Sequence, residues 1–164
     1  MAEVTLRGTP VHTIGELPTV GSPAPAYSLT GANLELLTDA DRRGTAIVLN
    51  IFPSIDTAVC AASVRAFNQR AAEREGVDVL CVSADLPFAQ RRFCGAEGID
   101  RVSTASTFRS TFGTDYGVTI VDGSLAGLLA RAVVVIGDDG TVAYTELVPE
   151  IAQEPDYDAA LAAL

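Results

Sequence analysis

The chain has 164 residues, of which 48% are hydrophobic and 20% are charged. This composition favours a folded domain with a full core over a disordered chain. The net charge of −10 would repel a phosphate backbone, which argues against a nucleic-acid partner. No apolar run approaches the roughly 18 residues of a membrane span, and the first residues lack the basic and apolar regions of a signal peptide. We therefore expect one domain over residues 1–164 that is cytoplasmic and has no membrane partner.

The first quarter of the chain is expected to form peripheral strands and loops. Val4 to Ile14 alternates around Gly8-Thr9-Pro10 and predicts a β-hairpin. Gly15 to Ala26 is rich in Gly and Pro and predicts a surface loop. Tyr27 to Leu37 is expected to add one short strand, and Asp39 to Gly44 a polar turn. The only histidine, His12, falls in the hairpin, where exposure or packing is a commoner role than catalysis.

A strand, a proline and a helix start follow one another between residues 46 and 65. Ala46 to Phe52 is a short β-branched apolar run, which predicts a buried strand. Pro53 ends that strand because it has no N–H to donate to a ladder. Thr57 is a plausible N-cap of a helix from Ala58 to Glu75. Cys60 then lies in the first turn, where unpaired N–H groups and the helix dipole favour a thiolate.

The rest of the chain alternates strands with helices. Strands are expected at Val77–Ser83, Val102–Ser106, Ala132–Ile136 and Val142–Val148, with a tight turn at Asp138-Asp139-Gly140 before the last of them. Helices are expected at Leu86–Ala96, capped by Asp85, at Thr107–Tyr116, and from Pro155 onward. This order predicts an α/β sheet with helices on both faces, which a thioredoxin-like fold satisfies.

The chain has three cysteines, Cys60, Cys81 and Cys94, and their number and spacing limit the disulfide and metal chemistry that it can have. An odd count argues against a disulfide framework, and no Cys-x-x-Cys pair is present. A structural zinc site would need closer ligand pairs, so we expect no metal and no cofactor. Cys81 lies between Leu80 and Val82 in a predicted strand, where a cysteine is most often a buried small hydrophobe.

Four sequence blocks resemble a known family. Pro53, Thr57 and Cys60 form the pattern Pro-x-x-x-Thr-x-x-Cys, the active-site motif of peroxiredoxins. It is followed in order by Ser83-Ala-Asp-Leu-Pro-Phe-Ala-Gln, Arg92-Phe-Cys-Gly-Ala-Glu-Gly and Ala130-Arg-Ala-Val-Val-Val-Ile. Together they resemble the bacterial thiol peroxidases, the atypical two-cysteine branch of the peroxiredoxins. The resemblance covers nearly the whole chain and implies a thioredoxin-like peroxiredoxin fold, with an N-terminal β-hairpin and a central mixed sheet flanked by helices.

The resemblance also implies a role for each motif residue. Cys60 would be the peroxidatic nucleophile and Cys94 the resolving cysteine of an intramolecular disulfide. Arg131 would be the active-site cation that bonds Cys60 and a peroxide oxygen. The Thr57 hydroxyl would accept from the peroxide while donating to the thiolate, and Pro53 would shield the site from water. The implied partners are a hydroperoxide, preferably organic, thioredoxin as electron donor, and a second copy of the chain in a homodimer.

Structural readings of the same residues stay open at this point. Thr57 can be only an N-cap, Arg131 only a surface charge, Pro53 only a strand terminator, and Cys60 only a structural thiol. An apolar set around the motif can line an alkyl pocket or belong to the core: Phe52, Ile55, Val59 and Phe93.

Three other functions compete with a peroxidase. A disulfide oxidoreductase needs the missing Cys-x-x-Cys pair. A cysteine hydrolase needs a base beside the thiol, and His12 is the sole histidine. A non-enzymatic redox sensor could use the same two cysteines and would differ only in its slower turnover of peroxide.

Cys60 and Cys94 both fall in predicted helices, and a disulfide needs Cα atoms within about 7 Å. We therefore expect one or both segments to unwind locally before the two cysteines join.

Overall fold

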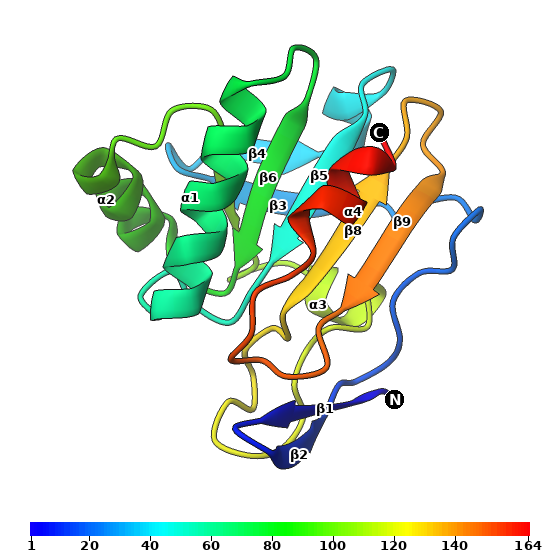
Figure 1. Ribbon diagram of the computed structural model, residues 1–164, viewed down its shortest axis with the longest axis vertical. Helices are drawn as coiled ribbons and strands as arrows, with labels where there is room; N and C mark the ends of the chain where they lie inside the picture. The colour runs from blue at the N-terminus through cyan, green and yellow to red at the C-terminus, as the bar shows by residue number, and fades with distance from the viewer.

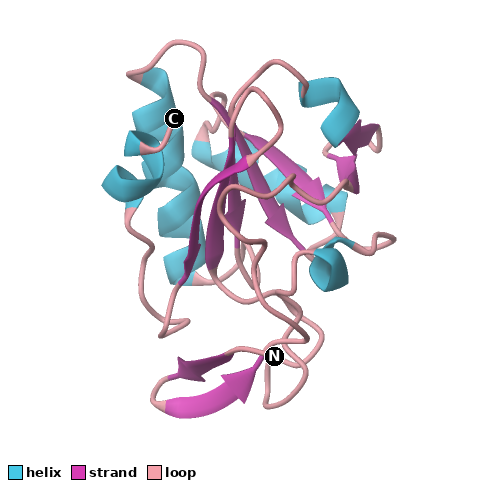
Figure 2. Ribbon diagram, turned by 90° about the vertical axis from the view of Figure 1, so that its right-hand side faces the viewer, coloured by secondary structure: helices cyan, strands magenta, loops and turns pink.

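The computed structural model describes residues 1–164 and contains a seven-stranded mixed sheet and a separate two-stranded hairpin (Figures 1 and 2). The strand order of the large sheet is β4-β3-β7-β6-β5-β8-β9. Its strands are β3 (Ser28–Gly31), β4 (Leu36–Thr38), β5 (Ile47–Ile51), β6 (Asp78–Ser83), β7 (Ser103–Ser106), β8 (Ala132–Ile136) and β9 (Val142–Leu147). The hairpin consists of β1 (Glu3–Leu6) and β2 (Thr9–His12).

The centre of the sheet is built from the most β-branched segments of the chain. β5 pairs in parallel with β6 and antiparallel with β8, and all five residues of both β5 and β8 are buried. Successive side chains point to opposite faces. Val48 therefore packs in one core cluster and Leu49 in the other. A strand buried on both faces has a nearly continuous apolar sequence, interrupted in β5 only by Asn50, which explains why these two strands could be predicted.

Helices cover both faces of the sheet. α1 (Ala58–Ala72) and α4 (Tyr157–Ala162) bury Phe67 and Leu161 against the face that carries Val48. α3 (Phe112–Asp115) buries Phe112 on the opposite face, with Leu49. α2 (Pro87–Glu97) packs against β7, and Figure 1 shows it beside α1. None of these helices is long and apolar enough to cross a membrane.

The N-terminal hairpin lies below the sheet in Figure 2, and it is hydrogen-bonded to the loop after β9. Val4 and Val11 pack with Ile151 in a small third cluster. The Glu150 carboxylate accepts hydrogen bonds from the Thr5 hydroxyl at 2.7 Å and from the backbone N–H groups of Arg7 and Gly8. The hairpin tip and this loop therefore form one unit.

These hydrogen bonds give a pH prediction for Glu150. The donors, the Thr5 hydroxyl first, lower the pKa of Glu150 from 4.5 to about 2. A lowered carboxylate pKa stabilises the fold above the unfolded value, and the stabilisation is lost as the pH falls through the folded value. We expect Glu150→Gln to lower the free energy of unfolding most at neutral pH, with the difference from wild type shrinking between about pH 4.5 and about pH 2. Denaturant titrations across this range measure it, and a pH-independent difference would contradict it.

Three predicted elements differ in the structure. Tyr27 to Leu37 holds two antiparallel strands, β3 and β4, because the Gly31 N–H and the Leu34 N–H close a tight turn within it. The polar segment after β4 contains a short 3₁₀ helix, η1 (Asp39–Arg42). The helix expected at Thr107–Tyr116 is only α3, because the Thr107 and Ser110 groups form separate turns before it.

Three helix boundaries also differ. The helix expected to start at Pro155 begins at Tyr157, with Asp156 as its N-cap. The helix expected to run to Glu75 ends at Ala72, although Gly76 adopts the expected left-handed conformation after it. Asp85 does not cap α2, whose N-cap position is Leu86 without a side-chain cap. The Asp85 carboxylate is instead engaged by three donors from other segments.

Candidate active site

The segment after β5 leads to Cys60, which is buried near the start of α1. The Phe52 N–H still donates to the Val82 carbonyl of β6, and buried Pro53 follows. The chain then turns through Ser54, whose carbonyl accepts from the Thr57 N–H, and α1 begins at Ala58. Cys60 is the third residue of α1 and is fully buried. As the sequence predicts, the thiol lies in the first helical turn, where backbone N–H groups are unpaired.

Arg131 reaches Cys60 because of the register between two strands. Ile51, the last residue of β5, pairs with Ala132, the first residue of β8. Arg131 therefore stands just beyond the end of β5, and its Nη2 donates to the Cys60 Sγ at 3.3 Å. The reading of Arg131 as a surface charge is wrong, because the residue is only 2% exposed.

The Arg131 guanidinium is held from the other side by backbone. Its Nε donates to the Ile151 carbonyl at 2.8 Å, whereas its Nη1 has no hydrogen-bond partner although it is buried. A buried donor without a partner is costly, so this nitrogen is suited to a substrate oxygen. The Ile151 carbonyl could not be predicted from the sequence, because a backbone acceptor carries no residue-type signal.

Thr57 occupies the predicted N-cap position, but its hydroxyl does not cap the helix. The hydroxyl donates to the Ser54 carbonyl at 3.0 Å. The expected donation from Thr57 to the thiolate is therefore not the arrangement in this structure. Because its hydrogen is used by Ser54, the Thr57 oxygen is left to act as an acceptor.

Cys94 lies in α2 and is half-buried, and all three cysteines are free. Burial raises the pKa of the Cys94 thiol above its ordinary value, and a hydrogen bond with Thr104 opposes part of that rise. Cys60 and Cys94 are thus carried by separate helices, α1 and α2.

Cys81 is fully buried in β6, and burial raises its pKa to about 12. A thiol with this pKa is almost entirely protonated at neutral pH and is a poor nucleophile. We expect Cys81→Ser to leave peroxide turnover nearly unchanged in a coupled steady-state assay. A loss of turnover comparable to that of a Cys60 variant, in a protein that still melts cooperatively, would contradict this prediction.

A cleft of about 430 Å³ opens between the start of α1 and α2. Of the apolar set around the motif, Ile55 and Phe93 line this cleft together with Thr57. Phe52 is fully buried, does not line the cleft and belongs to the core under α1. Val59 is half-buried and does not line the cleft either.

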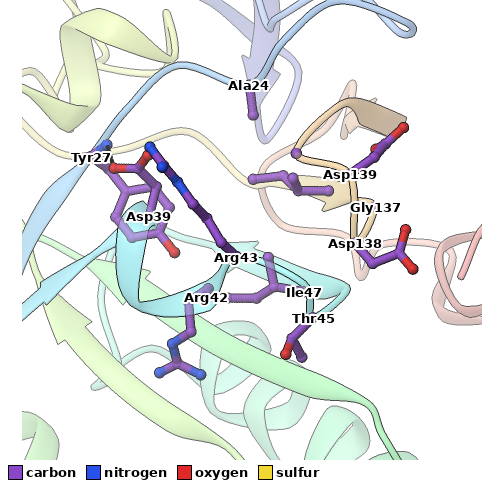
Figure 3. A pocket seen from close by; sticks show the side chains of 12 residues that line it. Ala24, Tyr27, Asp39, Arg42, Arg43, Thr45, Ile47, Gly137, Asp138 and Asp139 are labelled. Atoms are coloured by element: carbon purple, nitrogen blue, oxygen red, sulfur yellow. Dashed lines mark hydrogen bonds between the residues drawn. The ribbon is translucent and has the colours of Figure 1, made fainter.

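Another cavity, of about 400 Å³, lies at the opposite end of β5 from Cys60 (Figure 3). It is lined by Ile47, the first residue of that strand, and by Tyr27, Asp39 and Arg43. The buried Tyr27 hydroxyl has no hydrogen-bond partner. No cysteine lines this cavity, so it does not belong to the thiol site.

His12 does not serve Cys60. Its Nδ1 is 2.7 Å from an Asp122 carboxylate oxygen, and its Nε2 is 3.4 Å from Glu3. The hydrogen bond to Asp122 raises the pKa of His12. The only histidine is thus engaged on the peripheral hairpin, and the base that a cysteine hydrolase requires is not bonded to the thiol.

Comparisons with known proteins agree with this geometry. The Redoxin family model matches residues 19–161. The chain is 67% identical over 164 residues to thiol peroxidase of Mycobacterium bovis, covering 100% of this chain and 99% of that one. It is 54% identical over the same coverage to thiol peroxidase of Corynebacterium glutamicum.

Solved structures show the same fold. A peroxiredoxin-like protein from Aquifex aeolicus has a TM-score of 0.93 and 42% identity, covering 99% of this chain and 95% of that one. Thiol peroxidase from Chromobacterium violaceum has a TM-score of 0.90 at 20% identity, covering 98% and 93%. The thioredoxin-like peroxiredoxin fold expected from the sequence is confirmed. The chain therefore belongs to the Redoxin family and to its thiol peroxidases, which makes it a peroxide-reducing oxidoreductase.

Proposed function

We propose that Cys60 is the peroxidatic nucleophile of a thioredoxin-recycled peroxidase and that Cys94 resolves it. The observation that carries this proposal is the contact of 3.3 Å between Arg131 Nη2 and Cys60 Sγ, both buried, at the start of α1. A fixed cation and a helix N-terminus both favour the thiolate, which is the reactive form of cysteine.

The first step is a displacement on oxygen. The Cys60 thiolate attacks one oxygen of the hydroperoxide, the O–O bond breaks, and the other oxygen leaves as an alkoxide or hydroxide that takes up a proton. The sulfur is oxidised to a sulfenic acid and the peroxide is reduced to an alcohol or water. The free Nη1 of Arg131 stabilises the oxygen on which charge develops.

Thr57 and Pro53 prepare the peroxide for this step. With its hydrogen donated to Ser54, the Thr57 hydroxyl oxygen accepts from the O–H of the peroxide. Pro53 is buried next to the loop and keeps water from the thiolate. Orientation of the peroxide in line with the sulfur accounts for a large share of the acceleration.

The second step closes a disulfide within the chain. The Cys94 thiol condenses with the Cys60 sulfenic acid and water is released. Since the two thiols lie in α1 and α2, one or both of these segments must unwind locally before the bond forms. Thioredoxin then donates two electrons, which returns both thiols. If the backbones of the reduced and oxidised crystal structures were the same throughout Thr57–Arg65 and Leu86–Gly98, this would contradict the unwinding.

Organic hydroperoxides are the proposed substrates, with hydrogen peroxide as a secondary one. Ile55 and Phe93 give the cleft in front of Thr57 apolar walls, which suit an alkyl group. Catalytic efficiency on cumene hydroperoxide should exceed that on hydrogen peroxide. A clear preference for hydrogen peroxide would contradict the alkyl-binding role of the cleft.

The assembly is proposed to be a cytoplasmic homodimer of single-domain chains. Leu86 and Phe88 at the start of α2 are 51% and 58% exposed, and a second copy would cover this apolar surface. Sedimentation equilibrium on the reduced protein measures the mass, and a monomer at micromolar concentration would contradict the dimer.

The test of the cycle is peptide mapping without reduction, after one equivalent of cumene hydroperoxide and then after thioredoxin. A Cys60–Cys94 disulfide that forms within one chain and is removed by thioredoxin is expected. A Cys60–Cys81 bond would keep the peroxidase but replace the resolving residue. An unreactive Cys60 would overturn the proposed cycle.

A further inference from the structure

One carboxylate holds the loop that precedes Cys60. Asp85 Oδ1 accepts from the Ser54 hydroxyl at 2.7 Å, and Asp85 Oδ2 accepts from the Ile55 N–H at 2.7 Å. Ser54 and Ile55 lie about 30 positions before Asp85 in the chain, in the first turn of the segment between Pro53 and α1. The two bonds tie the active-site loop to the connection between β6 and α2.

Asp85 is itself fixed by its surroundings. The Ser83 hydroxyl, at the end of β6, donates to Asp85 Oδ2 at 2.6 Å. The buried Gln90 side chain of α2 donates from Nε2 to the Ser83 hydroxyl at 3.0 Å and to the Ala105 carbonyl at 2.9 Å. The Asp85 carbonyl accepts from the Ser106 hydroxyl. Both the side chain and the backbone of Asp85 are therefore held by the sheet and by α2.

Ser54 connects this carboxylate to the reacting groups. Its hydroxyl is bound by Asp85, and its carbonyl accepts from the Thr57 hydroxyl at 3.0 Å and from the Thr57 N–H at 3.2 Å. The direction of the Thr57 hydroxyl is thus set by a carbonyl whose own position depends on Asp85. Charge-assisted hydrogen bonds to a carboxylate are the stronger class of such contacts.

We propose that Asp85 is a positioning residue for peroxide reduction, acting through Ser54 on the orientation of the Thr57 hydroxyl. Asp85 makes no hydrogen bond to Cys60 and does not line the cleft beside Thr57. Its contribution is to keep the Thr57 oxygen aimed at the peroxide. The inference rests on the proposed roles of Cys60 and Thr57. Misplacement of an orienting group by about 1 Å can lower a rate by about 100-fold.

The experiment compares two reactions of Cys60 in the full-length protein. Because the chain has no tryptophan, oxidation by cumene hydroperoxide is followed by rapid quenching and mass spectrometry. Alkylation by iodoacetamide is followed in the same way, and it needs the thiolate and access to it but not the Thr57 acceptor. Asp85→Ala is expected to lower the rate constant for oxidation by about 10-fold to 100-fold while the alkylation rate stays at the wild-type value.

Two further variants separate positioning from general damage. Asp85→Asn keeps one acceptor oxygen for the Ile55 N–H and is expected to recover part of the lost rate. Asp139→Ala is the matched control, since Asp139 also accepts from a backbone N–H and a hydroxyl, both of Thr141, but in the turn before β9. It is expected to react with the peroxide as wild type does.

A double-mutant cycle tests the route through Thr57. If Asp85 acts through Thr57, Asp85→Ala should have little further effect on peroxide oxidation in a Thr57→Val background, because the group it positions is gone. Additive losses, equal losses in oxidation and alkylation, or a wild-type oxidation rate for Asp85→Ala would each overturn the inference. Failure of the proposed function itself is distinguishable, because wild-type Cys60 would then not be oxidised at all.

Discussion

Arg131→Lys is expected to lower the rate constant for oxidation of Cys60 by cumene hydroperoxide by about 100-fold or more, the usual loss when one preorganised donor to a developing charge is removed. The guanidinium donates in two directions, from Nε to the Ile151 carbonyl and from Nη2 to Cys60 Sγ. Its Nη1 has no hydrogen-bond partner and remains available to a substrate oxygen. A lysine keeps the charge but has a single nitrogen on a flexible stem. It cannot hold the backbone, the sulfur and a substrate oxygen in the same arrangement.

The measurement is the same quenched-flow assay, run on variants whose melting temperatures are known. Arg74→Lys is the matched control, because Arg74 also donates to a backbone carbonyl, that of Leu161, but lies beyond the C-terminal end of α1. It is expected to leave the oxidation rate unchanged. An Arg131→Lys protein that reacts at the wild-type rate would show that charge alone, without the forked geometry, is sufficient.

The core strands could be predicted from the sequence because their pattern is local. Ala132–Ile136 is confirmed at the same residues, and β5 falls within the predicted Ala46–Phe52 run. The turn between β3 and β4 could not be predicted, because it places the non-glycine residue Leu34 at φ 65°. Such backbone is rare outside glycine and asparagine, and here it accompanies the turn that the Leu34 N–H closes on the Gly31 carbonyl.

The candidate site divides in the same way. The position of Cys60 in a first helical turn follows from local signals, and the structure agrees. Cys60 and Arg131 are 71 residues apart, and no spacing rule joins them. From the sequence, only the family resemblance indicates that the two residues lie together. In the structure, the register between β5 and β8 brings them together. The prediction that Asp85 caps a helix is wrong for a related reason. Its local setting favours a helix cap, but three donors from the sheet and the active-site loop occupy its oxygens.

Cys94→Ser is expected to stop thioredoxin-supported turnover after a single oxidation. The variant keeps Cys60 and Arg131, so one equivalent of peroxide should still convert Cys60 to a sulfenic acid at the wild-type rate. No intramolecular disulfide can then form, and thioredoxin has no substrate bond to reduce. Cys94 is half-buried and not in the central sheet, so the serine should not disturb the fold around Cys60.

Two readouts separate this outcome from loss of the site. A dimedone adduct on Cys60, seen by mass spectrometry after one equivalent of cumene hydroperoxide, reports the trapped sulfenic acid, and NADPH consumption in the thioredoxin-coupled assay reports turnover. Cys81→Ser, which removes a thiol of pKa about 12 from the core strand β6, is the control and should keep turning over. Sustained turnover of Cys94→Ser would assign resolution to another thiol, because the Cys60 sulfenic acid becomes a disulfide, with release of water, only by condensing with a second thiol.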